Sequence, residues 1–166
     1  ASMLSPGTPT RAGYTFAGWY TAASAGTLVT FPYAHGRTSD FTLFARWTAN
    51  TLAVTYNSGG GSSVTATSTT TGASMLSPGT PTRAGYTFAG WYAAASGGSA
   101  ITFPYAHGRT SDFTLFARWT ANTLTVTYNS GGGSSVTATS TTTGGTVVIP
   151  GTPTRAGYTF AGWYAA

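Results

Sequence analysis

Gly85-Tyr86-Thr87-Phe88-Ala89-Gly90-Trp91-Tyr92 is the most aromatic stretch of the chain, and its pattern decides the fold. Tyr86 and Phe88 lie two positions apart, which places them on one face of a β-strand. Gly90 interrupts the alternation, and we expect it to form a bend or β-bulge that lets Trp91 turn inward. The stretch therefore predicts a β-strand that anchors an aromatic core.

The same octapeptide occurs three times, because the whole chain repeats itself in a fixed register, with no insertion or deletion. Ala1–Ala49 differs from Ala73–Ala121 at 5 of 49 positions, and Asn50–Ala94 differs from Asn122–Ala166 at 6 of 45 positions. Tandem copies multiply length, valency or lattice contacts, whereas a catalytic domain needs one well-formed site. The repeat therefore predicts a structural or adhesive protein and not an enzyme.

The phase of the repeat divides the chain into one complete unit and two partial ones. Residues 50–121 form the complete repeat, residues 1–49 match the C-terminal part of a unit, and residues 122–166 match the N-terminal part of a unit. Two interpretations are open at this point. The chain is a window on a longer array, or neighbouring molecules complete each other's broken units by strand exchange, which near-identical repeats permit.

The first part of the unit has the pattern of a β-hairpin. Thr51–Asn57 alternates apolar and polar residues, which is typical of a half-buried strand. Ser58–Ser62 contains consecutive glycines that allow a tight turn, and Ser63–Thr71 is rich in β-branched residues. We therefore expect two strands joined by the glycine turn.

Prolines shape the middle of the unit. Ala73–Ser77 is expected to pack against the sheet, whereas Pro78 and Pro81 exclude a helix interior and predict an extended crossing. Ile101–Tyr105 is expected to be a short edge segment, because Pro104 cannot donate a ladder hydrogen bond. No segment shows an apolar stripe of helical period, so we expect a mostly β fold with little helix.

The unit ends in a predicted core strand, Asp112–Thr120, whose apolar residues alternate onto one face. Only Thr120-Ala121-Asn122-Thr123 separates this strand from the first strand of the next unit. So short a connection limits bending, and the array should be a semi-rigid rod. Strands of this length would advance the rod by about 20 to 35 Å per unit.

The composition favours an extracellular or cell-surface setting in a bacterium. Charged residues make up 5% of the chain, against roughly 25% in soluble globular domains, and Thr, Ser, Gly and Ala take their place. Cysteine is absent, which excludes disulfides, thiol nucleophiles and Cys-ligated metals. Lysine and glutamine are also absent, which excludes Lys–Asn isopeptide and Thr–Gln ester cross-links. Noncovalent packing must therefore hold each unit together.

The net charge of +5 does not indicate nucleic-acid binding, because the arginines are scattered and form no basic stripe. No signal peptide is visible. No apolar run approaches the roughly 20 residues of a transmembrane helix, so we expect no membrane insertion in this segment.

Three motifs of the unit resemble the internalin-type B-repeat, also called the Listeria-Bacteroides repeat. They are Val54–Gly61 (VTYNSGGG), Pro81–Tyr92 (PTRAGYTFAGWY) and Asp112–Thr120 (DFTLFARWT). With their offset copies they cover essentially the whole chain. The resemblance implies a tandem array of 72-residue β-grasp-like modules in a large bacterial surface or secreted protein, acting as a stalk or adhesion segment without catalytic residues. The chain differs from the family habit in its low charge and in the near-identity of its copies.

His107, Ser111 and Asp112 supply the residue types of a hydrolase triad within six positions. A triad needs groups that converge from separate elements beside an oxyanion hole, so we interpret this segment as a capped loop. His107 and Asp112 provide two potential metal ligands, whereas a stable site usually has three or four. The sequence predicts no catalytic residue, no metal site and no cofactor.

The aromatic residues divide into a predicted core and candidate contacts. Exposed aromatics on a β surface can stack on sugars or form contacts between rods. We expect a non-catalytic stalk, filament or adhesive rod whose partners are copies of itself, through axial, lateral or strand-exchange contacts, and also host or cell-wall glycans or proteins. The alternative is a carbohydrate-binding adhesin module. The expected core residues are Val54, Tyr56, Phe88, Trp91, Leu115 and Trp119, and the candidate interface or ligand contacts are Tyr92, Tyr105, Phe116 and Arg118.

Overall fold

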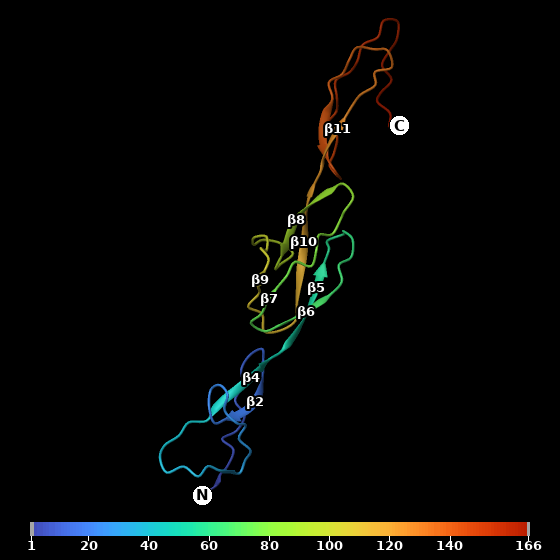
Figure 1. The fold of residues 1–166 in the computed structure, drawn as a ribbon. Coiled ribbons are helices and arrows are strands. Elements are labelled where there is room, and N and C mark those ends of the chain that lie inside the picture. Colours follow the sequence, from blue (N-terminus) through green and yellow to red (C-terminus); the bar gives the residue numbers. More distant parts are fainter. Residues whose placement is uncertain (1, 166) are drawn as a thin grey trace.

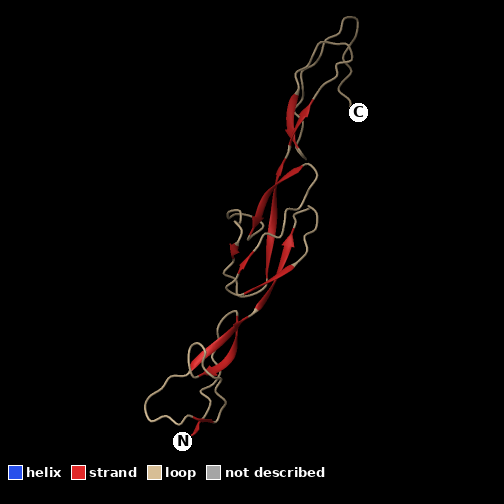
Figure 2. Cartoon of the chain, in the orientation of Figure 1, coloured by secondary structure: helices blue, strands red, loops and turns tan. Residues whose placement is uncertain are grey.

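The computed structural model describes residues 2–165, which form three lobes strung along one axis (Figure 1). The middle lobe holds the complete unit, and the two outer lobes contain the partial ones. Residues 2–165 contain strands and loops but no helix, as the absence of a helical apolar stripe predicts (Figure 2). Across this described range, no segment is a helix capable of spanning a membrane.

The strands follow one another in the order of the repeat. They are β1 (Ser2–Met3), β2 (Tyr14–Tyr20), β3 (Tyr33–Ala34), β4 (Phe44–Ala49), β5 (Thr51–Asn57), β6 (Thr67–Thr70), β7 (Ser74–Met75), β8 (Tyr86–Tyr92), β9 (Tyr105–Ala106), β10 (Phe113–Ala121), β11 (Thr123–Val126) and β12 (Thr139–Thr142).

The complete unit is built on a four-stranded mixed sheet with the order β6-β5-β10-β8. β5 and β6 form the expected antiparallel hairpin, in register from Thr51↔Thr70 to Val54↔Thr67. β6 is shorter than the predicted strand 63–71. The chain leaves the hairpin after the glycine turn because Ser62 bonds to Thr82 instead, with its N–H donating to the Thr82 carbonyl at 2.8 Å.

β10 lies in the middle of the sheet and joins its two halves. It pairs with β5 in parallel, from Phe113↔Val54 to Phe116↔Asn57. It pairs with β8 in antiparallel orientation. The first and last strands of the unit are therefore neighbours, although the whole of the segment 58–112 lies between them along the chain.

The predicted bulge in β8 is confirmed. Arg118 pairs with Gly90 and Trp119 pairs with Phe88, which leaves Ala89 without a partner in the ladder. Gly90 has a φ of +132°, a conformation that favours glycine. The extra residue brings Trp91 to the same face as Phe88, and Trp91 is only 2% exposed.

The core lies on one face of this sheet, where aromatic rings meet edge to face. Trp91 contacts Phe88 and Tyr56 with ring centroids 5.7 and 5.2 Å apart, and Phe88 contacts Trp119 at 5.5 Å. The buried residues of the cluster are Val54, Met75, Trp91, Leu115 and Ala117, and the partly buried residues packed against them are Tyr56, Val64, Phe88, Ile101, Phe103, Tyr105, Phe113 and Trp119.

The segment 73–77 only partly follows the expectation that it packs against the sheet. Met75 is buried in the core, whereas Leu76 is 77% exposed. β7 pairs with β9 through Ser74↔Ala106 and Met75↔Tyr105. Successive side chains of an extended segment point in opposite directions, so burying Met75 turns Leu76 outward.

The partial units lose strand wherever the pairing partner is missing. β4 lacks the counterparts of Phe113–Leu115, and β11 lacks the counterparts of Thr55–Asn57. In the complete unit these two segments face each other in the parallel β5–β10 ladder. Residues 158–164 likewise contain no strand, whereas the same sequence forms β8 where β10 is present beside it.

Candidate functional site

The connection between units is a single residue, shorter than the four-residue link expected from the sequence. Asn50 alone separates β4 from β5. Its N–H donates to the Gly13 carbonyl at 2.9 Å, and its own carbonyl accepts from the Thr71 N–H at 3.0 Å. Its Oδ1 accepts from the Thr15 hydroxyl at 2.7 Å. Gly13 and Thr15 belong to the preceding unit and Thr71 belongs to the following one. The hydrogen bonds of Asn50 therefore link the two units.

The second connection repeats these bonds. Asn122, between β10 and β11, donates its N–H to the Gly85 carbonyl at 2.9 Å and accepts from the Thr143 N–H at 2.9 Å. Its Oδ1 accepts from the Thr87 hydroxyl at 2.7 Å. We call each set of four residues a joint: Gly13, Thr15, Asn50 and Thr71 form the first, and Gly85, Thr87, Asn122 and Thr143 form the second.

The joint glycines permit close contact between units. A Cβ atom on Gly85 would lie 2.6 Å from Thr143 Cγ2, and one on Gly13 would lie 2.7 Å from Thr71 Cγ2. Both glycines also have positive φ angles, +78° and +77°. Other residues rarely adopt this backbone conformation, and no side chain fits at this distance. The sequence does not single out the joint residues, although the Arg-Ala-Gly-Tyr turn that carries Gly85 lies within the Pro81–Tyr92 motif.

The second candidate surface is an aromatic patch on the face of the sheet opposite the core. Phe116 and Tyr92 are direct cross-strand partners and both are half-buried. Phe116 alternates with the buried residues Leu115 and Ala117, so it points away from them. The guanidinium carbon of Arg118 lies 3.9 Å from the centre of the Tyr92 ring. We call Tyr92, Phe116 and Arg118 the sheet-face patch.

The preceding unit presents the same patch. Tyr20 pairs with Phe44, and the guanidinium carbon of Arg46 lies 4.2 Å from the centre of the Tyr20 ring. The sheet-face patch therefore occurs in two successive units.

Arg118 has a structural role within the patch. Its Nη2 donates to the Ala94 carbonyl at 3.0 Å and to the Gly97 carbonyl. The side chain thereby holds the small-residue loop 93–99, where several of the differences between copies fall.

Tyr105 does not join the sheet-face patch. It is half-buried against the core, and its ring meets Phe103 edge to face with centroids 6.4 Å apart. This placement follows from the pairing of β9 with β7, which turns Tyr105 toward Met75. Of the four candidate contacts, Tyr92, Phe116 and Arg118 come together and Tyr105 lies with the core.

His107, Ser111 and Asp112 also have separate surroundings. His107 is 6% exposed, its Nδ1 accepts from the Arg109 N–H at 3.0 Å, and its Nε2 lies 3.4 Å from the Thr69 hydroxyl. Asp112 accepts the Ala53 N–H through Oδ1 at 2.8 Å. His107 and Asp112 thus serve the local fold, and in residues 2–165 no three His, Cys, Asp or Glu side chains gather around a potential metal position.

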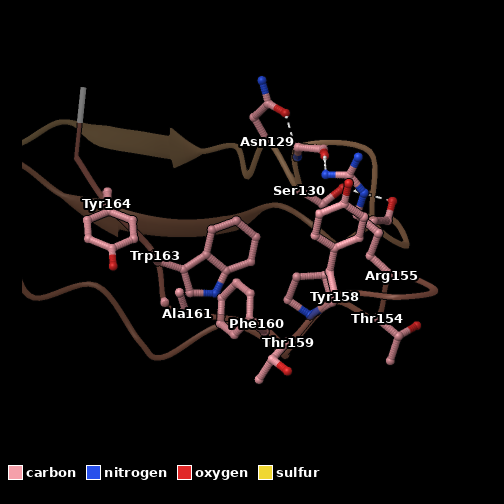
Figure 3. A pocket seen from close by; sticks show the side chains of 14 residues that line it. Asn129, Ser130, Thr154, Arg155, Tyr158, Thr159, Phe160, Ala161, Trp163 and Tyr164 are labelled. Carbon is pink, nitrogen blue, oxygen red and sulfur yellow. Dashed lines mark hydrogen bonds between the residues drawn. The ribbon is translucent and has the colours of Figure 1, made fainter.

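The third candidate surface is a groove in the C-terminal partial unit (Figure 3). It has a volume of about 370 Å³ and lies between the 129–133 turn and residues 153–164, with Tyr158, Phe160 and Trp163 along it. In the complete unit the corresponding space holds Trp119, whose Nε1 donates to the Ser58 carbonyl at 2.8 Å. The groove therefore corresponds to the position that the tryptophan of the last strand occupies in the complete unit.

Comparison with known proteins agrees with the repeat pattern. The family model of the Listeria-Bacteroides repeat domain matches residues 1–46, 53–118 and 125–166. No solved structure matches the chain.

Curated proteins also match the chain, among them the following three. A protein of Evansella cellulosilytica provisionally named a membrane protein is 32% identical over 165 residues, 99% of this chain and 24% of its own length. A second protein of that organism, provisionally named a Gly-rich membrane protein, is 32% identical over 154 residues, 92% of this chain and 18% of its own length. Internalin H of Listeria monocytogenes is 37% identical over 117 residues, 70% of this chain and 21% of its own length. The chain thus covers about a quarter or less of the length of each of these three relatives.

Proposed function

The chain belongs to the Listeria-Bacteroides repeat family, and from this premise we propose that it is a non-catalytic structural segment of a bacterial cell-surface or extracellular protein. In this role the repeats form a stalk, filament or adhesive rod. The observation that carries the proposal is the pair of joints, whose hydrogen bonds recur with equivalent partners. In both joints the asparagine N–H bond to glycine measures 2.9 Å and the threonine hydroxyl bond to the asparagine Oδ1 measures 2.7 Å. A repeated bonded joint supports a rod of defined axial spacing.

We also propose that each unit is β-grasp-like. The support is the mixed four-stranded sheet in which the first and last strands lie side by side and parallel in the centre. The relatives support a surface location, because two carry membrane-protein names and the third is an internalin.

Electron microscopy of the native material tests the structural role. We expect thin rods or filaments with an axial repeat of about 20 to 35 Å. Isolated compact particles without an axial repeat would contradict the proposal. A matched sample carrying Gly13→Val and Gly85→Val should lose straightness, because each valine would collide with the threonine of the next unit.

For partners, we propose that copies of this chain associate by strand exchange. The groove of one molecule would receive the last strand of another, with Trp47 of β4 taking the place that Trp119 occupies in the complete unit. Support comes from the identity of residues 30–49 and 102–121, and from the exposed side chains of the receiving partial unit, where Tyr158 is 67% and Ile149 is 91% exposed. Strand addition of this kind satisfies an open sheet edge.

Light scattering tests this association. Discrete oligomers or fibres that dissociate on dilution are expected. Trp47→Ala should weaken them, whereas Leu4→Ala, which removes an apolar side chain that is 76% exposed, should not. A mass that stays monomeric at all concentrations would count against strand exchange.

The alternative function is a carbohydrate-binding module, and the sheet-face patch favours it. The patch residues are half-buried, and the aromatic surface that they leave accessible suits the apolar faces of sugar rings. Titration with soluble cell-wall and host glycans should then produce a calorimetric signal that Tyr92→Ala combined with Tyr20→Ala abolishes. A flat titration of the parent protein at millimolar glycan would remove this alternative.

A further inference from the structure

We propose that the complete unit resists stretching through a shear clamp made by β5 and β10. The clamp consists of the four parallel residue pairs that join Val54–Asn57 to Phe113–Phe116. The proposal deepens the structural role proposed above and rests on it. Its consequence is that the array can transmit tension along a surface-anchored rod without unfolding.

The path of the chain through the unit places this clamp in the line of tension. The chain enters the unit at Thr51, the first residue of β5, and leaves it at Ala121, the last residue of β10. Figure 1 shows β4 leading into β5 and β10 leading into β11 along the long axis. Tension on the rod therefore pulls the start of β5 and the end of β10 in opposite directions.

The parallel pairing determines how that tension acts on the hydrogen bonds. Because β5 and β10 run in the same direction side by side, pulling their opposite ends slides one strand along the other. Ladder bonds run across the strands, so they share the sliding load and must break together. An antiparallel hairpin pulled at its two open ends would instead lose its bonds one pair at a time.

Two side-chain bonds reinforce the clamp. The hydroxyls of Thr55 and Thr114 lie 2.7 Å apart across the pair of strands. Asp112 Oδ1 accepts the Ala53 N–H at 2.8 Å, just outside the parallel ladder. A bond to a carboxylate is stronger than a neutral one, so Asp112 strengthens the end of the clamp. This bond gives Asp112 a structural role in the clamp.

The clamp carries the load that passes along the backbone of the unit. The chain leaves the clamp at Asn57, beside Phe116, and returns to it at Phe113, beside Val54. The segment between them includes β6 and β8, and load reaches it through its pairing with β5 and β10 and through the joint residues Thr71, Gly85 and Thr87. The joints lie in series with the clamp, since Asn50 and Asn122 connect it to the neighbouring units.

Single-molecule pulling in two directions tests the clamp on the full chain. The chain has no native cysteine, so introduced cysteines give unique attachment points. Thr51→Cys with Thr120→Cys loads the clamp in shear, and Thr51→Cys with Thr70→Cys peels the hairpin from its open end, because Thr51 and Thr70 are direct partners. All three positions are exposed strand residues, so these variants leave the core intact.

We expect the first pair to rupture at a force several-fold higher than the second. Its rupture should be a single event that releases about 20 nm of chain, the extended length of roughly 70 residues minus the folded length. Equal rupture forces in the two directions would overturn the clamp while leaving the structural role intact. Absence of axial order in the native material would contradict the structural role, whatever the pulling experiment shows.

A substitution series locates the resistance. In the shear direction, Asp112→Ala should unfold about tenfold faster at constant force, since it removes a charge-assisted hydrogen bond from the clamp. Ser68→Ala, an exposed change on β6 outside the clamp, should leave that rate unchanged. Equal rates for Asp112→Ala and the parent would overturn the assignment of resistance to the β5–β10 pair.

Discussion

At the scale of the residue, the joint glycine is the position where adding a single methyl group should lower the free energy of unfolding most. Gly85→Ala adds a Cβ 2.6 Å from Thr143 Cγ2 at a φ of +78°. The backbone conformation alone costs an alanine about 1–3 kcal/mol, and the collision adds to it. Thr143→Ala should relieve the collision but not the backbone cost. A double-mutant cycle measured by chemical denaturation should therefore show a coupling of about 1 kcal/mol or more.

Gly157 provides the matched control for this cycle. It occupies the same position in the C-terminal partial unit with a φ of +77°, and no atom lies within 4 Å of its Cβ position. Gly157→Ala should leave the unfolding of the complete unit unchanged. Additive single substitutions at Gly85 and Thr143 would show that the units do not touch there in solution.

The arginines provide a second prediction at this scale, because all seven lie over an aromatic ring. The guanidinium carbon of Arg83 lies 3.8 Å from the centre of the Tyr86 ring, and its Nη1 donates to the Gly59 carbonyl at 3.1 Å. Arg83→Ala should cost about 1–2 kcal/mol of unfolding free energy. Arg109→Ala should cost less, because its guanidinium carbon lies 5.8 Å from the centre of the Phe113 ring. Thermal or denaturant unfolding of both variants distinguishes stacking from a general effect of charge, which would change both equally.

At the scale of the element, the bulge in β8 decides which way Trp91 points. Gly90→Val would disfavour the bulge, because a β-branched residue does not readily adopt the φ of +132° found there. Without the bulge Phe88 and Trp91, which are three residues apart, would point to opposite faces of the sheet. Trp91 fills the core at 2% exposure, and its loss should abolish cooperative unfolding of the complete unit. Gly97→Ala in the exposed loop 93–99 should leave unfolding cooperative, because the preceding copy carries an alanine at the equivalent position 25. A cooperative melt for Gly90→Val would contradict this role of the bulge.

The elements also show how far sequence reasoning reaches. The strand at 51–57, the hairpin and the bulge at Gly90 follow from local signals, namely alternation, consecutive glycines and a glycine that breaks the period. The parallel pairing of Val54–Asn57 with Phe113–Phe116 has no local signal, because it depends on packing between segments at opposite ends of the unit. The exposure of Leu76 has no local signal either. Met75 and Leu76 are both apolar, and only the pairing of the segment determines which of them points into the core.

The candidate sites were predictable to different degrees, because only some of them depend on local sequence patterns. Alternation places Phe116 opposite the buried face of β10, so the sheet-face patch could be anticipated in part. The joints could not, because their bonds link residues of different units and involve mainly backbone groups. Because Pro104 marks residues 101–105 as an edge segment, the sequence predicts a surface position for Tyr105. Only the pairing of β9 with β7 shows that Tyr105 packs against the core.

At the scale of the whole molecule, the three lobes show that the burial of a side chain depends on whether its unit is complete as well as on the local sequence. Leu52 is 3% exposed in the complete unit, whereas its counterpart Leu124 is 46% exposed in the C-terminal partial one. The hairpin is present in both, so the difference lies in the counterpart of residues 95–121, which the partial unit lacks and which includes the last strand. Burial in this fold therefore depends on that part of the unit.

Completing the C-terminal unit tests this dependence directly. A chain extended after Ala166 by a copy of residues 95–121 would provide the missing last strand, and its tryptophan would fill the groove that Trp119 fills in the complete unit. Calorimetry should show the unfolding enthalpy rising by up to roughly 50 kcal/mol, the value expected for about 70 newly ordered residues. Small-angle scattering should show the same axis lengthened and not a broader particle.

An otherwise identical extension with alanine in place of that tryptophan provides the control. It should recover only part of the enthalpy, because the cavity it leaves costs about 3–5 kcal/mol of stability. If both extensions left the enthalpy unchanged, the last strand would add no cooperative structure to the partial unit. Repetition alone would then not explain the stability of the array, and the contrast between Leu52 and Leu124 would need another cause.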